Sequence, residues 1–478
     1  MKRLCLFAVG LAGFVVGCGE QQAPTENSLA PNFASAAGTI RINVVLKRPA
    51  TSAQLSELGK YGSVLDRIVE INALQMKVKG TAALDAIRAL PFVAAASADR
   101  ERKIPPQVSI PLADFAGGLS TFNLDAINVT NFGANPPRRR VSQTGVGVYV
   151  AVLDTGLLDR WRYFFPIARI ATQFAKSFGG APDNSGSPNV SEQPNKWERD
   201  THGHGTHVTS IILGSLLGTV PLNGVAPQAT VIPVKVLNQN GSGSSFVVAH
   251  GIAYIGALKA GPLQNSPVVI NLSLGGPELD ASEEAAIDFA IAQGVVVVAA
   301  AGNEGTAGMS FPGAYPPVIS AAAAGWKDQW KACGGGAPVF VNWWVACDVP
   351  DPTVGGDLFI ENFSSRELSG QDLDVAAPGA WVVGPFAAGA LGQLSFFFVG
   401  GTSQASPHVA GLAALLLQQD PTRSQSDIDA ILENTAVPIP AGSASVFDPN
   451  LNAFETLSWG NDATGAGLIN AAAALGAP

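Results

Sequence analysis

Short apolar runs recur along the chain after residue 145, and they constrain its fold more than any other feature. The runs are Val146–Leu153, Thr230–Leu237, Val268–Leu272 and Val295–Ala300. Each run is apolar at nearly every position, which is typical of parallel strands covered on both faces. Helical patterns lie between the runs, including residues 244–260 and 282–293. The pattern predicts an α/β domain with a doubly wound, mostly parallel sheet.

Composition narrows the class of protein further. The 478 residues carry a formal net charge of −9, which argues against a nucleic-acid partner because phosphates need a basic surface. Only 14% of residues are charged and 47% are hydrophobic, so disorder is not expected over most of the length. Beyond the N-terminus, no apolar run reaches the roughly 18–20 residues of a membrane helix. We expect a monomer that acts outside the cytoplasm.

The N-terminus is typical of an export signal. Met1–Arg3 is basic and residues 4–16 are apolar. The sequence Val-Val-Gly-Cys ending at Cys18 resembles a bacterial lipobox, which predicts lipidation of Cys18 and a signal peptide over residues 1–18. An ordinary signal peptide with an incidental cysteine is the alternative. Residues 19–37 are small and polar and predict a flexible linker, so a lipid on Cys18 is the one membrane attachment that we expect.

Residues 38–103 predict a small α+β domain of their own. Strand patterns occur at 40–46, 64–69, 74–78 and 92–96, and helical patterns occur at 51–61 and 81–90. The order β-α-β-β-α-β is that of a ferredoxin-like unit. About 65 residues can fold alone, although only marginally. A free-standing small domain is one interpretation, and the sequence that follows it favours another role.

A connector is predicted between the two domains, over residues 104–140. It contains several prolines and the pair Gly117–Gly118, so we expect it to be exposed. Arg138–Arg140 is interpreted as a solvated loop, with a processing site as the alternative. The larger domain is then expected to cover residues 141–478.

Polar residues stand where the ligand-binding edge of the sheet is expected. Asp154 ends the first apolar run, and Asn303 follows the fourth. His204 stands in Gly-His-Gly-Thr-His-Val, 50 positions after Asp154. Ser403 precedes the apolar helical stretch 409–417, where a serine is usually a helix cap but can also be a nucleophile near the positive helix end.

These four residue types supply the parts of an acyl-transfer site. A serine is a poor nucleophile and needs a base within roughly 3 Å. A histidine is that base, and a buried carboxylate holds it in the right tautomer. An asparagine can donate a hydrogen bond to the tetrahedral oxyanion. The chain order Asp, His, Ser is one of the known orders of such a triad.

Residues 143–475 resemble the subtilisin-like serine proteases, or subtilases. The resemblance rests on these segments, in family order: VAVLDTG, GHGTHV, VKVLNQNGSG, NLSLGGP, VVVVAAAGNEG, LDVAAPG, GGTSQASPHVAGLAALLL and GAGLINA. It implies Asp154, His204 and Ser403 as the triad and Asn303 as the oxyanion donor, with His207 and His408 structural. It implies no cofactor for catalysis. Structural calcium is common in the family, but Asp159, Asp183 and Asn184 lack a recognisable ligand spacing, so we assign no metal site.

The resemblance also implies how a substrate binds. Two segments would sandwich an extended polypeptide by backbone pairing: Gly241, Ser242, Gly243 on one side and Ser273, Leu274, Gly275 on the other. The specificity pocket would be lined by Leu274, Ala300, Ala301 and Gly302, so we expect broad specificity with a large apolar or aromatic P1 residue. Residues 38–103 resemble the subtilase propeptide, which acts as an intramolecular inhibitor. The expectation is an exported, self-processing serine endopeptidase.

An insertion relative to the family lies at about 325–361. It contains Cys333 and Cys347, which predict a disulfide in an exported protein, with two free thiols as the alternative. It also contains four tryptophans, at positions 326, 330, 343 and 344. We expect these to pack the insertion against the domain, and a binding surface is the alternative.

Two rival functions remain. The cluster His202, His204 and His207 superficially matches a zinc hydrolase, although the aspartate expected before the last histidine is missing. An inactive protease fold that serves as a surface binding module is the non-enzymatic alternative, and it predicts that Ser403→Ala leaves function unchanged.

Overall fold

The computed structural model describes most of the chain after residue 37. The described residues are 38–104, 108–111, 121–131, 138–179, 191–192, 196–217, 220–330, 349–388 and 393–477. The predicted signal peptide, Cys18 and the linker lie outside them, as do Cys333, Cys347, Trp343 and Trp344. Within the described residues, no helix is long and apolar enough to cross a membrane.

The small domain has its secondary-structure elements in the predicted order β-α-β-β-α-β. They are β1 (Thr39–Leu46), α1 (Ser52–Leu58), β2 (Gly62–Ile68), β3 (Ala73–Lys79), α2 (Gly80–Arg88) and β4 (Val93–Ala98). The sheet is antiparallel with the order β2-β3-β1-β4. α1 begins where predicted because Thr51 and Gln54 form a capping box. Ile42, Val44 and Met76 are fully buried in its core.

The larger domain is built on a nine-stranded sheet with the order β11-β10-β14-β9-β16-β17-β18-β19, in which β20 also pairs with β18. The strands are β9 (Tyr149–Asp154), β10 (Lys176–Gly179), β11 (Ser191–Glu192), β14 (Thr230–Lys235), β16 (Val268–Leu272), β17 (Val295–Ala300), β18 (Ile319–Trp326), β19 (Leu358–Ile360) and β20 (Val375–Pro378). The β10/β11 and β18/β19 pairs are antiparallel and the other pairs are parallel. The predicted α/β class is confirmed.

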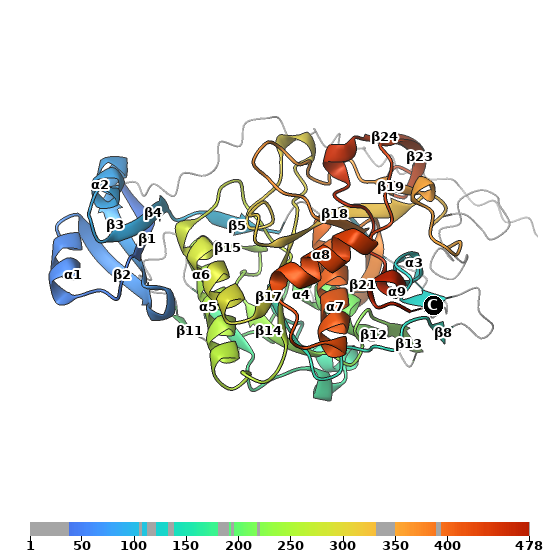
Figure 1. The fold of residues 1–478 in the computed structure, drawn as a ribbon, viewed down its shortest axis with the longest axis horizontal. Helices are drawn as coiled ribbons and strands as arrows, with labels where there is room; N and C mark the ends of the chain where they lie inside the picture. The colour runs from blue at the N-terminus through green and yellow to red at the C-terminus, as the bar shows by residue number, and fades with distance from the viewer. Residues whose placement is uncertain are drawn as a thin grey trace, which may run out of the picture. The chain divides into compact units, whose positions relative to one another are not determined.

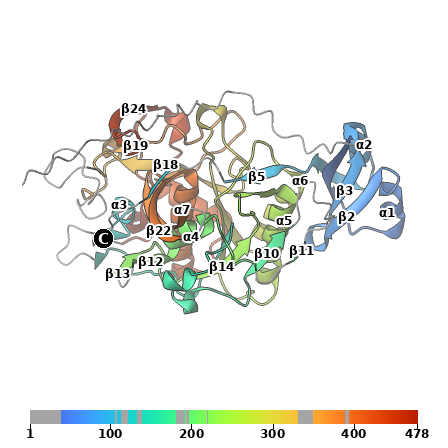
Figure 2. The same cartoon turned by 180° about the vertical axis from the view of Figure 1, so that it is seen from behind.

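Helices cover both faces of this sheet (Figures 1 and 2). α5 (Ser245–Ala260) and α6 (Ala281–Ala292) pack side by side against one face. α4 (His204–Leu213) and α7 (Thr402–Gln419) pack against the other. β9 shows why both layers are needed, because Val150 and Val152 belong to one core cluster while Ala151 and Leu153 belong to the other. Its near-continuous apolar sequence follows from this double burial.

The remaining elements complete the domain around this sheet. They are β5 (Glu101–Lys103), β6 (Val108–Pro111), α3 (Phe122–Ala126), β7 (Thr130–Asn131), β8 (Arg138–Arg139), β12 (Gly214–Leu217), β13 (Val220–Asn223), β15 (Ser242–Ser244), β21 (Val382–Ala388), β22 (Gln393–Gly400), α8 (Gln425–Thr435), β23 (Gly442–Asp448), β24 (Ala453–Trp459) and α9 (Ala471–Ala474). β6 pairs with β22, which places residues just beyond the small domain beside the strand that leads into α7.

Glycines set two element boundaries in the larger domain. β9 begins at Tyr149 and not at Val146, where the predicted apolar run starts, because Gly145 and Gly147 have positive φ angles of 81° and 84° and form a turn. α4 ends at Leu213 because Gly214, with a φ of 79°, terminates it and starts the β12–β13 hairpin.

Residues 121–131, 139 and 140 of the expected connector are buried or partly buried, and not exposed as predicted. α3 and the residues that follow it are buried in the core of the larger domain, with Phe122, Leu124 and Ile127 at most 3% exposed. The interpretation of the arginine run as a solvated loop is also wrong for two of its members. The Arg139 guanidinium donates to the carbonyl oxygens of Gln143, Gly224 and Val225, and Arg140 pairs with Asp351.

The described part of the insertion packs against the domain. Trp326 is in β18, and Trp330 follows it with only 3% of its surface exposed. The Trp330 ring contacts the rings of Trp381, Phe398 and Phe447 with centroids 5.4–6.5 Å apart. For Trp330, packing was the correct expectation. The predicted Cys333–Cys347 disulfide falls on residues outside the described ranges.

Replacing Trp330 by alanine tests this anchoring. Emptying such an aromatic site should destabilise the fold by about 3–5 kcal/mol, since the lost contacts leave a cavity. Thermal unfolding followed by fluorescence should show a clear fall in the melting temperature. Tyr163→Ala, at a side chain that is largely exposed, is the control and should change little. An unchanged melting temperature for Trp330→Ala would show that the insertion contributes nothing to stability.

Candidate active site

A buried carboxylate–imidazole pair stands at the end of the central strand. Asp154 is the last residue of β9, and His204 is the first residue of α4. The Nδ1 atom of His204 lies 2.8 Å from both carboxylate oxygens of Asp154, and neither side chain is exposed. A carboxylate only accepts hydrogen bonds, so the imidazole proton sits on Nδ1. Nε2 is therefore an acceptor, and among the described residues it has no hydrogen-bond partner.

The loop before His204 is held by a second carboxylate that sequence reasoning missed. The two oxygens of Asp200 accept from the backbone N–H groups of His202 and Gly203, each at 2.9 Å. One of them also accepts from the hydroxyl of Thr155, which in turn accepts from Gly205 N–H. Burial raises the pKa of Asp200 to about 7. An aspartate just before a helix start is a local capping signal, which could have identified it.

Ser403 lies in the first turn of α7 but does not cap it. The N-cap position is Gly401, and the Ser403 hydroxyl donates to the carbonyl oxygen of Ser273 at 3.2 Å. The Ser273 hydroxyl donates back to the Ser403 carbonyl oxygen at 2.8 Å and also contacts Ser406. This network holds the start of α7 against the segment that follows β16. The hydroxyl is therefore committed to Ser273 and not to the imidazole.

Asn303 follows β17, and its orientation is defined by its neighbours. Its Oδ1 accepts from the backbone N–H of Thr402 at 2.9 Å and from the Thr402 hydroxyl at 2.7 Å. With Oδ1 used in this way, Nδ2 faces Gly401, where an added Cβ would lie 3.3 Å from it. The amide Nδ2 of Asn303 thus lies beside Gly401, which is two residues before Ser403.

The two predicted substrate segments hold an extended strand between them. We call residues 101–104 the cleft strand, which comprises β5 and Ile104. β5 pairs antiparallel with β15 so that Arg102 faces Gly243 (Figure 1). On the other side, Lys103 and Gly275 exchange two backbone hydrogen bonds, both of 3.0 Å. Ile104 N–H donates to the carbonyl oxygen of Gly241 at 2.9 Å.

Contacts of the cleft strand connect the two halves of the site. Gly275, which pairs with Lys103, is two residues from Ser273, the partner of Ser403. An added Cβ at Gly241 would lie 2.9 Å from Ile104 and 3.2 Å from His202, whose ring centroid is 6.1 Å from that of His204. The cleft strand therefore runs between the serine side and the histidine side.

The predicted pocket residues surround the end of β17. Ala300, Ala301 and Gly302 are buried, and Gly302 has a φ of 108°. An added Cβ at Gly302 would lie 2.4 Å from the carboxylate of Glu304, which accepts from the hydroxyls of Ser310 and Ser365. The prediction of an apolar specificity pocket did not include this carboxylate. Leu274 is fully buried in the cluster against which Ile104 packs.

The small domain contacts the larger domain through buried carboxylates. Asp99 accepts from the Ser245 hydroxyl at 3.0 Å and from Phe246 N–H at 3.4 Å, at the start of α5. Asp280, the N-cap of α6, accepts from Asn43 and Ser97 of the small domain. Burial raises the pKa of Asp99 to about 6.

A zinc site built from the three clustered histidines is not supported. Nε2 of His207 lies 3.1 Å from the carbonyl oxygen of Val382, and Nδ1 of His204 is used by Asp154. Among the described residues, these imidazoles do not bring ligand atoms together as a metal site requires. The three histidines are therefore assigned separate roles.

One group of carboxylates elsewhere has the spacing of metal ligands. Oxygen atoms of Asp374, Asp429 and Glu433 lie within 4.8 Å of one another. Burial raises the pKa of Asp374 to about 8 and that of Asp429 to about 6, and Ser320 already donates twice to Asp374. A proton held by Asp374 and shared with Asp429 accounts for the proximity of these two carboxyl groups, so no calcium site is assigned.

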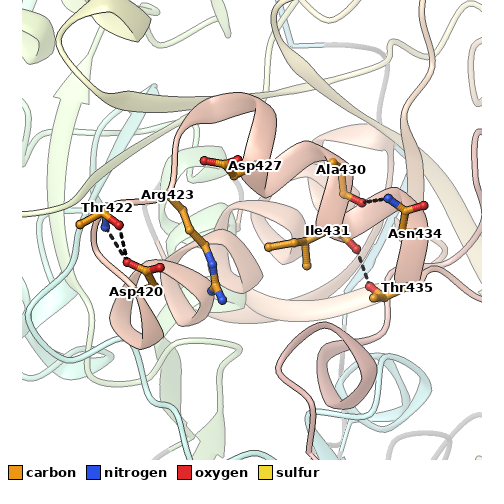
Figure 3. Close-up of a pocket in the computed structure, with 8 residues that line it drawn as sticks. All are labelled: Asp420, Thr422, Arg423, Asp427, Ala430, Ile431, Asn434 and Thr435. Atoms are coloured by element: carbon orange, nitrogen blue, oxygen red, sulfur yellow. Dashed lines mark hydrogen bonds between the residues drawn. The ribbon is translucent and has the colours of Figure 1, made fainter.

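A surface pocket formed by α8 and the turn that precedes it contains none of the predicted site residues (Figure 3). Its polar groups are used locally. Asp420 accepts from the backbone and hydroxyl of Thr422, and Asn434 donates to the carbonyl oxygen of Ala430. We assign this pocket no role.

Comparisons with known proteins agree on one family. The model of the subtilase family matches residues 145–467. Subtilisin Savinase from Lederbergia lenta is 34% identical over 331 residues, which cover 69% of this chain and 91% of that protein. Thermitase from Thermoactinomyces vulgaris is 30% identical over 317 residues, which cover 66% of this chain and 90% of that protein.

Solved structures show the same fold. Fervidolysin from Fervidobacterium pennivorans, a keratinolytic enzyme related to subtilisin, matches 92% of this chain with a TM-score of 0.63 and 23% identity. The match covers 61% of fervidolysin. Sphericase matches 74% of this chain and 99% of its own, with a TM-score of 0.53.

Buried histidines predict how stability depends on pH. His408 is fully buried between Gln404 and Asn123, and burial lowers its pKa from 6.5 to about 4. Below about pH 6.5 the unfolded chain takes up a proton that the folded chain does not, so this contribution to stability is lost as the pH falls toward 4. His408→Gln should flatten the fall of the melting temperature between pH 7 and 4.5. His250→Gln, at a partly exposed imidazole, is the control, and equal slopes for all three proteins would contradict the assignment.

Proposed function

Because the chain belongs to the subtilase family and is therefore a serine endopeptidase, we propose that Asp154, His204 and Ser403 are its catalytic triad. The observation that carries this assignment is the buried pair between Asp154 and His204, with Nδ1 of the imidazole 2.8 Å from both carboxylate oxygens. It leaves Nε2 as the basic atom. Asn303 is proposed as the oxyanion donor, because Thr402 orients its amide and Nδ2 faces Gly401, two residues before Ser403.

The proposed reaction follows from these positions. The Ser403 hydroxyl turns from the Ser273 carbonyl oxygen toward Nε2 of His204, gives up its proton and attacks the scissile carbonyl carbon. Catalytic hydrogen bonds of this kind are often absent until substrate is in place. Asn303 and the backbone N–H of Ser403 stabilise the oxyanion. The imidazolium then protonates the leaving amine, and water hydrolyses the acyl-enzyme with the same base.

The small domain is proposed to be a propeptide that inhibits its own enzyme. The cleft strand takes the backbone positions expected of a substrate, between β15 and Gly275. The Ile104 N–H donates a hydrogen bond to the carbonyl oxygen of Gly241. Val108 pairs with Gly400, which is three residues before Ser403. We therefore expect self-cleavage between Ile104 and Val108. We propose further that the protein is exported and acts on polypeptides outside the cytoplasm, as the predicted signal peptide requires.

The specificity pocket is proposed to accept a large apolar P1 residue, as its alanine walls suggest. Glu304 adds a carboxylate at its edge, so basic P1 residues are a second class that this pocket fits. Cleavage of peptides that differ only at P1 distinguishes the two.

Ser403→Ala should abolish self-processing. The variant loses the nucleophile, so it should accumulate as an unprocessed precursor that does not react with a fluorophosphonate probe. Gel mobility and N-terminal sequencing measure both points, and the wild-type sequence should begin between residues 105 and 108. Ser426→Ala, on the exposed start of α8, is the matched control and should process normally. Normal processing by Ser403→Ala would refute the triad and favour the binding-module alternative.

Asn303→Ala should slow catalysis without weakening substrate binding. Removing one oxyanion donor lowers kcat by roughly 10²–10³-fold, a magnitude known for enzymes of this type. KM should change little, since the donor acts mainly in the transition state. Steady-state kinetics on a peptide substrate measure both constants, with Asn434→Ala on α8 as the control. A proportional rise in KM with unchanged kcat would show that Asn303 binds substrate instead.

A further inference from the structure

A buried ion pair anchors the cleft strand to α6. The side chains of Arg102 and Glu283 are both 0% exposed. Nε of Arg102 lies 2.9 Å from each carboxylate oxygen of Glu283, and Nη2 also contacts this carboxylate. Glu283 stands in the first turn of α6, eight positions after Gly275, which pairs with the cleft strand.

The rest of the guanidinium is also recognised. Nη2 donates to the carbonyl oxygen of Glu278 at 2.9 Å. An added Cβ at Gly276 would lie 2.7 Å from Nη1, so the backbone there packs directly against the guanidinium. A planar side chain with several donors fits this enclosure, whereas a lysine ammonium offers one centre and cannot form the same fork.

Removal of the small domain leaves Glu283 without this partner. Burying a carboxylate without a cation is unfavourable, so a polypeptide that covers Glu283 in the vacated cleft binds best when it brings a cation to it. Burial already raises the pKa of Glu283 to about 7 with Arg102 present. The cleft that binds the strand by its backbone therefore also contains a side-chain pocket with a defined chemistry.

We propose that Glu283 makes the mature enzyme selective for polypeptides with an arginine at the position whose backbone faces Gly243. This inference rests on the proposed function, in which the cleft strand occupies the substrate site. The arginine lies upstream of the cleaved bond, so it is independent of the P1 preference. Glu283 is then a specificity-determining residue that contacts the substrate. The ion pair between Arg102 and Glu283 shows how a substrate arginine would bind there.

Peptide-library cleavage tests the proposal. Mature wild-type enzyme, with active sites counted by fluorophosphonate titration, cleaves a mixed peptide library, and mass spectrometry reads the residues around each cut. We expect arginine to be enriched at a single upstream position. A peptide with glutamine at that position should have a kcat/KM roughly 10- to 100-fold lower than the arginine peptide. A peptide with lysine there should lose less.

Variants at α6 complete the test. Glu283→Gln should lose the arginine preference while it still cleaves the library, and Glu283→Leu should shift the preference to an apolar residue. Glu284→Gln, one position along the same helix, should behave as wild type. If the wild type cleaves without upstream arginine enrichment, or if Glu283→Gln keeps that enrichment, the inference is wrong. If Glu283 variants fail to mature, the wild-type comparison of arginine, lysine and glutamine peptides decides alone. A wild type that cleaves nothing refutes the proposed function itself.

Discussion

The contact between Asp154 and His204 is the interaction on which the rest of the site depends. A carboxylate at the end of a fully buried strand is costly unless it is paired and hydrogen-bonded. Here the imidazole of His204 and the backbone N–H of Thr155 provide these contacts. The sheet supplies the position, because β9 lies between β14 and β16 and its two faces are covered by separate helical layers. Pairing with the neighbouring strands of this sheet likewise sets the positions of the segment after β16 and of Asn303 after β17.

Loop and helix ends then refine what the sheet positions. Asp200 organises the turn into α4, and the serine network around Ser273 fixes the start of α7. Thr402 orients the Asn303 amide through two hydrogen bonds to one oxygen. The side chain of each of these residues contacts a neighbouring group of the protein, so its role can be recognised only when that partner is known.

Strongly periodic or motif-rich parts of the sequence were predicted well. β16 and β17 have the predicted bounds, since their apolar runs are bracketed by turn residues. Asp154, His204 and Asn303 stand beside strand or helix ends as expected. Partners distant in sequence could not be predicted, because nothing in the local pattern of Arg102 or Glu283 indicates that they meet 181 positions apart. The prediction that the connector is exposed was wrong for the same reason, since the burial of Phe122 depends on neighbours elsewhere in the chain.

The pairing of residues on both sides of 105–107 has a consequence for how activity is controlled. While the backbone is continuous, the small domain and the cleft belong to one molecule, so their effective concentration is set by the short linking segment and dilution does not lower it. A single cut there would turn the same contacts into a bimolecular complex. Occupancy of the cleft would then depend on the concentration of the protein, so dilution alone would favour release of the small domain.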